Sequence, residues 1–217
     1  VRIAILGDSM AEGIQVARAD TFPAVLEMQL NQDETCFGGR PVEVLNFAVQ
    51  GYGTAQQYLT LDRHVWPFDP DLVLLAAFPG NDIRDNSKAL KGNLYLPFYH
   101  LKDGALALDT SFRSHWSYHL RAIGARIIQH SLLAQMINQV RGLLKAQIRA
   151  NTDRQETLGA GLGEAGIDNM VFLDPPPPEW AAAWDVTEAL IARANADARA
   201  RTVPFHLAVL GTAIEGN

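Results

Sequence analysis

The sequence predicts a three-layer α/β/α domain built on a parallel β-sheet, and three observations lead to that prediction. Apolar runs alternate with helical patterns over roughly the first 85 residues, which is the order of repeated βαβ units. The run at 71–78 is apolar almost throughout, as expected of a strand covered on both faces. Three runs end in glycine or in a small polar residue, at the sheet edge where α/β domains bind ligands.

The chain order of the elements follows from these patterns and from the turn residues between them. We expect strands at 1–7, 42–49, 71–78 and 204–210, and helices at about 11–31, 54–65 and 185–201. Residues 20–23 divide the first helical region, because Pro23 is typical of an early helical position. Residues 38–41 form a glycine- and proline-containing turn.

Residues 86–178 depart from this alternation, and we interpret them as an insertion within a single domain of residues 1–217. The segments 93–100 and 105–108 predict a short hairpin, and 114–150 has helical spacing. A glycine-rich, polar loop at 152–169 and a stiff proline run at 174–178 follow. We expect the insertion to lie over or beside the cleft at the strand ends.

Composition excludes several classes of function. The 217 residues carry a net charge of −6, which argues against a general nucleic-acid binder. The single cysteine, Cys36, excludes an intrachain disulfide and a multi-cysteine metal site. The longest apolar runs are too short to cross a bilayer. We expect neither a metal nor another cofactor.

Three motifs at predicted strand ends carry the chemistry. Ser9 follows the first strand in Gly7-Asp8-Ser9, Gly51 follows the second, and Asn81 follows the third in Gly80-Asn81-Asp82. A parallel sheet brings these ends to one edge, so a hydroxyl nucleophile meets a backbone N–H donor and a carboxamide donor. Such donors build the oxyanion hole of acyl-transfer enzymes.

With these motifs the chain resembles the SGNH (GDSL-type) hydrolase superfamily. The resemblance implies a three-layer α/β/α fold with a flavodoxin-like parallel sheet. It also implies that Ser9 is the nucleophile and that the Ser9 amide, the Gly51 amide and the Asn81 side chain form the oxyanion hole. The competing G-x-S-x-G elbow of α/β-hydrolases is excluded, because Ala11 stands where its second glycine belongs.

The chain departs from this family in one element. An Asp-x-x-His block near the C-terminus supplies the family's general base, and no histidine here has Asp three residues before it. The six histidines are His64, His100, His115, His119, His130 and His206. The histidine of the family follows a strand such as 204–210, so we expect a trimmed chain whose base lies beyond residue 217. The resemblance favours a periplasmic or extracellular location.

The predicted function is therefore ester hydrolysis through an acyl-serine intermediate, on a small-molecule or carbohydrate ester. Transfer of the acyl group to a polysaccharide, and a non-catalytic domain that binds a glycan or another partner, are the alternatives. A nucleotide or flavin binder is less well supported, because no phosphate-binding glycine loop follows the first strand. From their position alone, Asp82, Arg84 and Asp85 are candidates to bind substrate, although we interpret Asp8 and Asp82 mainly as structural hydrogen-bonding groups.

Three further features have ordinary interpretations. Residues 113–149 are basic and lack acidic residues, which is compatible with membrane-surface contact but more typical of a solvated helix face. His115 and His119 are spaced for one helix face but lack a third metal ligand, so surface histidines are favoured. The G-x-G-x-x-G pattern at 161–166 has no strand before it, and we interpret it as loop. The oligomeric state is open.

Overall fold

The computed structural model describes residues 1–33, 35–92, 95–137, 139–142 and 169–211. The chain divides into two compact units. The first consists of Val1–Asn93, Pro97–Asp109 and Asp168–Asn217, and the second of Leu94–Leu96 and Thr110–Ile167. This division places the hairpin of the predicted insertion in the first unit, and the extent of that insertion stays a prediction.

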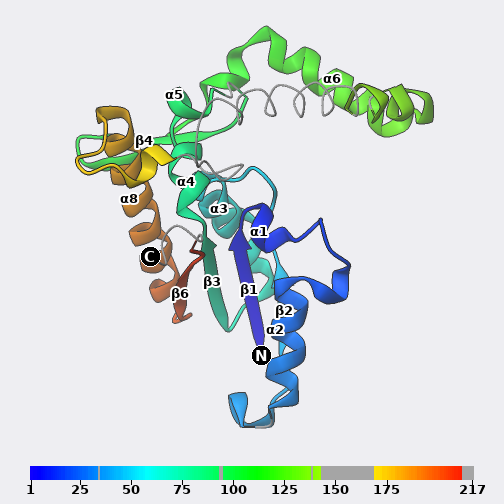
Figure 1. The fold of residues 1–217 in the computed structure, drawn as a ribbon, viewed down its shortest axis with the longest axis vertical. Coiled ribbons are helices and arrows are strands. Elements are labelled where there is room, and N and C mark those ends of the chain that lie inside the picture. Colours follow the sequence, from blue (N-terminus) through cyan, green and yellow to red (C-terminus); the bar gives the residue numbers. More distant parts are fainter. Residues whose placement is uncertain (34, 93–94, 138, 143–168, 212–217) are drawn as a thin grey trace. The chain divides into compact units, whose positions relative to one another are not determined.

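A four-stranded parallel sheet forms the centre of the first unit (Figure 1). Its strands, in spatial order, are β2 (Glu43–Asn46), β1 (Arg2–Gly7), β3 (Leu72–Ala77) and β6 (Phe205–Val209). Their registers are parallel throughout, so all four carboxyl ends lie at one edge. The four predicted strands are confirmed; β1 is one residue shorter at its start, and the other three are shorter at both ends.

Helices cover both faces of this sheet, which confirms the three-layer α/β/α fold. Ala4 and Leu6 of β1 pack into a cluster with α3 (Thr54–Thr60) and α8 (Pro178–Ala200). Ile3 and Ile5 point to the opposite face, where α1 (Ser9–Glu12) and α2 (Phe22–Gln32) contribute to a second cluster. Burial on both faces explains why the central strands β1 and β3 are apolar almost without alternation.

Two helices begin or end differently from the sequence-based expectation. The region 11–31 is not one helix, because α1 ends at Gly13 in the left-handed conformation and α2 begins only at Phe22. The division predicted at 20–23 is confirmed. Helix α8 begins at Pro178, before the expected start near 185, because proline at the first helical turn has the right φ and needs no N–H partner there.

Shorter elements complete the described chain. They are α4 (Pro79–Asp85), α5 (Lys88–Lys91), the antiparallel hairpin β4 (Phe98–Lys102) and β5 (Ala105–Asp109), the π-helical η3 (Leu61–Val65), and the 3-10 helices η1 (Arg18–Asp20), η2 (Cys36–Gly39), η4 (Trp66–Phe68), η5 (Ser111–Ser114) and η6 (Asn169–Phe172). The predicted hairpin is confirmed, with its first strand starting at Phe98.

The predicted helical region of the insertion is confirmed as far as the structure describes it. Helix α6 (Trp116–His130) is followed by helical residues 132–137 and 139–142. The remainder of that region, residues 152–168 of the predicted loop, and the G-x-G-x-x-G pattern at 161–166 lie outside the described residues.

Candidate active site

Ser9 is the first residue of a helix that begins directly at the end of a buried strand. Asp8 caps this helix by accepting a hydrogen bond from the Met10 N–H at 2.9 Å. Gly7 is required by packing, since a Cβ there would lie 2.7 Å from Cβ of Ala11. The Gly-Asp-Ser sequence therefore builds a tight strand-to-helix turn with the serine half-buried at the carboxyl edge of the sheet.

Asn81 is held beside Ser9 by the same capping aspartate. It lies in the first turn of α4, directly after β3, and its Nδ2 donates to Oδ2 of Asp8 at 3.0 Å. Asp8 is fully buried, so this bond is shielded from water. The amide nitrogen carries two hydrogens, and the bond to Asp8 uses one of them. The first and third motifs are thus joined, and one N–H of the Asn81 side chain is left available for another acceptor.

Gly51 follows β2 in a backbone conformation that favours glycine. Its φ is +77°, and a Cβ built there would meet nothing within 4 Å. Glycine is therefore selected at this position by backbone conformation rather than by lack of space. The segment runs beside the end of β1, where the Val49 N–H donates to the Gly7 carbonyl at 3.2 Å. The three predicted residues Ser9, Gly51 and Asn81 accordingly follow three adjacent strands (Figure 1).

Two charged side chains hold the peptide groups on either side of the Gly51 N–H. Oε2 of Glu12 accepts from the Gln50 N–H at 2.6 Å, and Nζ of Lys91 donates to the Gly51 carbonyl. Lys91 is itself fixed by Oδ2 of Asp85 at 2.8 Å. The peptide that bears the Gly51 N–H lies between two anchored ones, which restricts its orientation. Sequence analysis missed both Glu12 and Lys91, because no local pattern links either residue to Gly51.

The three residues predicted to bind substrate have partners within the protein. Asp82 is buried, and its oxygens accept from the Phe78 N–H at 2.8 Å and from Gln57 Nε2 at 3.3 Å. Asp85 is buried between Lys91 and the half-exposed Arg84. Asp82 thus has the contacts of a structural hydrogen-bonding group, and substrate contact by Asp82, Arg84 and Asp85 stays a prediction.

Burial raises the pKa of Asp82 well above its ordinary value. The bond from the Phe78 N–H opposes this shift, and the nearby negative charge of Asp8 adds to it. Burial of the ionised carboxylate lowers the stability of the folded state. Protonation of Asp82 is therefore expected to stabilise the fold.

Asn86 is a third residue that sequence analysis missed. Its Oδ1 accepts from the Ala55 N–H at 2.8 Å, and its Nδ2 donates to Thr187 Oγ1 at 2.6 Å. This buried side chain therefore joins the start of α3, the end of α4 and helix α8. Gly53 packs closely against Asp85 in the same region. A larger residue would not fit at position 53, because a Cβ there would lie 2.9 Å from Cβ of Asp85.

The described residues contain no histidine hydrogen-bonded to Ser9, and His206 lies within β6 as the sequence predicts. They also contain no group of three or more His, Cys, Asp or Glu side chains placed to hold a metal ion. His119 makes an edge contact with the ring of Tyr118. Within the part of the chain that is described, the site is one of hydroxyl, amide and backbone groups.

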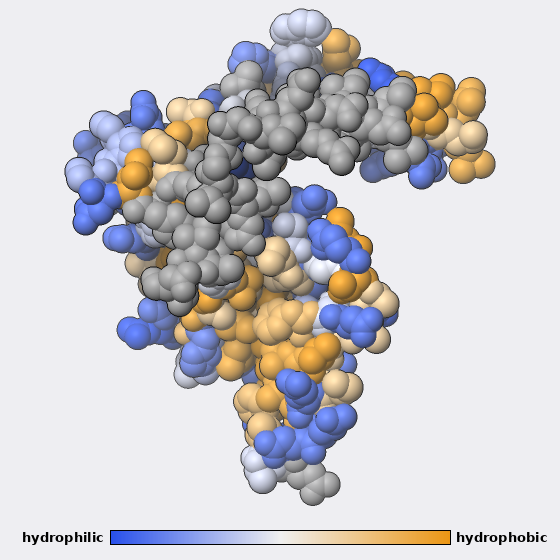
Figure 2. Space-filling view, in the orientation of Figure 1, coloured by the Kyte–Doolittle hydropathy of each residue, from blue (hydrophilic) through white to orange (hydrophobic). Residues whose placement is uncertain are grey.

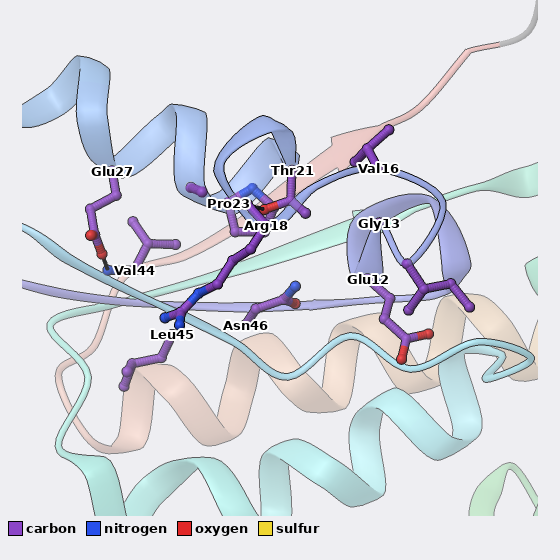
Figure 3. Close-up of a pocket in the computed structure, with 12 residues that line it drawn as sticks. Glu12, Gly13, Val16, Arg18, Thr21, Pro23, Glu27, Val44, Leu45 and Asn46 are labelled. Carbon is purple, nitrogen blue, oxygen red and sulfur yellow. Dashed lines mark hydrogen bonds between the residues drawn. The ribbon is translucent and has the colours of Figure 1, made fainter.

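A groove of about 550 Å³ adjoins the helix that carries Ser9 (Figure 3). It runs between the loop after α1, the start of α2 and the outer edge of β2. In Figure 3, Arg18 extends toward Leu45, and Glu27 accepts from the Val44 N–H at 2.6 Å. The groove meets the candidate active site at Glu12 and Gly13, which line its end.

Comparisons with known proteins give structural matches alone. No protein-family model matches the chain, and no curated protein does. The matching solved structures include AlinE4, an SGNH-hydrolase family esterase, with 24% identity, coverage of 42% of this chain and 43% of that chain, and a TM-score of 0.32. TesA matches with 21% identity, coverage of 44% and 51%, and a TM-score of 0.34. The acetyl xylan esterase AlAXEase matches with 20% identity, coverage of 43% of each chain and a TM-score of 0.30.

These matches span about half or less of the matched structures' length. Every one of these TM-scores is below 0.5. The candidate site is therefore defined by the three motifs and by the positions of their residues in the fold. The chain resembles the SGNH hydrolases. That resemblance comprises Gly-Asp-Ser after β1, glycine after β2 and Gly-Asn-Asp after β3, with the Asn81 amide bonded to Asp8.

Proposed function

We propose that this protein is a serine esterase that hydrolyses its substrate through an acyl-serine intermediate. The observation that carries the proposal is the arrangement of Ser9, Gly51 and Asn81 after three adjacent parallel strands. The proposal assigns the Ser9 hydroxyl as the nucleophile and the Gly51 N–H and the Asn81 amide as donors, and their anchored surroundings support it. These groups meet the main requirement of acyl transfer, which is stabilisation of a tetrahedral oxyanion.

In the proposed reaction Oγ of Ser9 attacks the ester carbonyl carbon and loses its proton to a general base. The carbonyl oxygen becomes negative and accepts hydrogen bonds from the N–H groups of Ser9 and Gly51 and from Nδ2 of Asn81. The bond to the alcohol oxygen then breaks, and the base returns its proton to that leaving group. Water, deprotonated by the same base, attacks the acyl-serine; the bond to Oγ of Ser9 breaks, the acid is released, and the base returns the proton to Oγ.

The general base is inferred from the resemblance to the SGNH hydrolases alone. In SGNH hydrolases it is the histidine of an Asp-x-x-His block, which this sequence does not contain. Activity is therefore measured on protein expressed from the complete reading frame, so that every segment of the natural product is present.

The proposed substrate is an ester of a small molecule or of a carbohydrate, and acetylated sugars are the first class to test. An acyltransferase uses the same nucleophile and the same oxyanion hole. It differs in the acceptor, so consumption of the acyl donor would depend on an added polysaccharide instead of on water. Measuring free acid with and without a glycan acceptor separates these two activities.

Labelling with a fluorophosphonate tests the nucleophile. We expect one covalent adduct by intact mass, lost in Ser9→Ala and retained in Ser114→Ala, an exposed serine of the second unit. Ester turnover falls by at least about a thousandfold in Ser9→Ala. An adduct that persists in Ser9→Ala, or an unlabelled complete protein, contradicts the proposal.

A further inference from the structure

Helix α6 of the second unit exposes an apolar stripe. Its members recur four, three and four residues apart, which places them on one face of the helix. They are 57–74% exposed and comprise Trp116, Leu120, Ile123 and Ile127. No residue of α6 is buried. A helix of a globular domain ordinarily buries such a stripe against its own core. No described residue covers this face, so it is suited to contact with an apolar partner.

The helical residues that follow continue the same kind of surface. Their apolar side chains are 52–81% exposed and comprise Leu132, Leu133, Met136, Ile137 and Val140. In Figure 2, orange residues gather on the exposed surface of these helices. Nine large apolar side chains within 25 residues of sequence are thus exposed in one unit.

The charged side chains of this part of the sequence are all of one sign. The 24 acidic residues of the chain lie outside residues 110–152, a segment that carries five arginines and a lysine. Arg126 lies three residues after Ile123, so it flanks the stripe. Neither Arg126 nor Arg141 forms an ion pair with another described residue. An apolar helix face flanked by arginines that pair with no described acidic residue fits a partner with an apolar interior and a negatively charged surface.

We infer that α6 and the helical residues 132–137 and 139–142 dock on the surface of an anionic lipid bilayer, with the apolar stripe among the acyl chains and the arginines at the phosphates. Helix α6 is about 22 Å long and amphipathic, as interfacial helices are. No helix among the described residues is long and apolar enough to cross a membrane. Each arginine near an anionic surface strengthens such docking, and salt weakens it.

A second copy of the chain is the competing occupant of this face, and charge argues against it. A symmetric dimer brings the same patch of both copies together. Residues 110–152 contain no acidic partner for the arginines, so a contact through these helices would place like charges opposite one another. Anionic lipid supplies the opposite charge that a second copy lacks.

Cosedimentation with vesicles tests the inference without any measurement of turnover, so Ser9→Ala protein serves equally well. The vesicles are phosphatidylcholine alone or an equal mixture with phosphatidylglycerol, at about 50 mM and about 500 mM NaCl. We expect binding to the anionic vesicles at low salt and little binding to the neutral ones. Ile123→Ser with Ile127→Ser, and separately Arg126→Gln with Arg141→Gln, each weaken binding by about tenfold or more.

Met28→Ser is the matched control, since Met28 is an exposed apolar residue on a helix of the first unit. It should bind vesicles like the unaltered protein. All five substituted side chains are exposed, so circular dichroism should show unchanged helix content. Binding that is absent, equal on neutral vesicles, or lost equally in Met28→Ser overturns the inference. A dimer in light scattering that the two serine substitutions dissociate also overturns it, because a second copy then covers the face.

Discussion

At the strand ends of the first unit, Gly7, Gly53 and several polar groups are packed tightly against their neighbours, whereas the helices of the second unit present apolar side chains to solvent. Asp8, Asp82 and Asn86 are buried with hydrogen-bonded partners. Ile123 and Leu132 are mostly exposed. A site that orients a reacting group needs the first kind of environment. A surface that contacts a variable partner such as lipid needs the second, so the two regions should respond to substitution in opposite ways.

Substitutions in the two regions should differ most in their effect on the rate of ester hydrolysis. Asn81→Ala removes the side-chain oxyanion donor, and we expect ester hydrolysis to fall by about 100- to 1,000-fold with the fold retained. Ile123→Ser, in the second unit, should leave hydrolysis of a water-soluble ester unchanged. Steady-state kinetics on both variants makes the comparison. A loss below about threefold in correctly folded Asn81→Ala would remove Asn81 from the mechanism.

Glycine-to-alanine substitutions should change stability with opposite signs in the two regions. In Gly7→Ala the new Cβ lies 2.7 Å from Ala11 Cβ and 3.1 Å from the Ala76 carbonyl oxygen, so we expect a loss of about 1–3 kcal/mol. In Gly124→Ala, within α6, the new Cβ meets nothing within 4 Å, and the helix gains about 0.5–1 kcal/mol. Urea unfolding followed by circular dichroism measures both changes. Equal signs would contradict the difference in packing.

The same contrast explains what the sequence could predict. Ser9, Gly51 and Asn81 were predictable because each lies within five residues of the end of a strand, and parallel strands end at one edge. The links among them were not. Asn86 contacts a backbone group 31 residues away, and Lys91 one 40 residues away. Such partners are chosen by the packing of the completed fold and leave no periodic signal in the chain.

In the second unit the limit of prediction was different. Helical spacing predicted α6 and the residues after it, but period alone does not say which surface covers an apolar face. The basic segment was therefore interpreted as a solvated helix face. Exposure of the apolar stripe, a property of the folded chain, is the observation on which the inferred docking to lipid rests.

The anchoring of Gly51 gives a smaller, more specific effect on the first unit. Lys91→Met removes the bond to the Gly51 carbonyl, and we expect kcat to fall about tenfold with KM changed less than about twofold. Lys91→Arg keeps a cation beside Asp85 and should recover part of the loss. Lys88→Met is the control on the same helix, because its pairing with Asp109 is partly exposed and contributes little. Equal losses at Lys88 and Lys91 would show a general disturbance of α5.

The smallest expected effect concerns Asp82, whose pKa is raised by burial. The folded state holds this proton more tightly than the unfolded chain does. The free energy of unfolding therefore falls as pH rises from the unfolded pKa, about 3.9, through the folded one. Asp82→Asn is neutral at every pH and can still accept the Phe78 N–H. We expect its Tm to exceed that of the unaltered protein by about 2–4 °C at neutral pH, and the difference to shrink toward pH 4.

Asp62→Asn, on the exposed surface of η3, is the control and should show no such trend. Thermal unfolding at a series of pH values, followed by circular dichroism, gives the three curves. A difference that grows on acidification would mean that ionised Asp82 stabilises the fold through its bonds to Phe78 and Gln57. The buried carboxyl would then act as an anchor for the α4 turn that carries Asn81, and its replacement should reduce turnover together with stability. A difference that grows toward neutral pH instead identifies Asp82 as a group that costs stability, which is consistent with a region selected for the placement of Asn81.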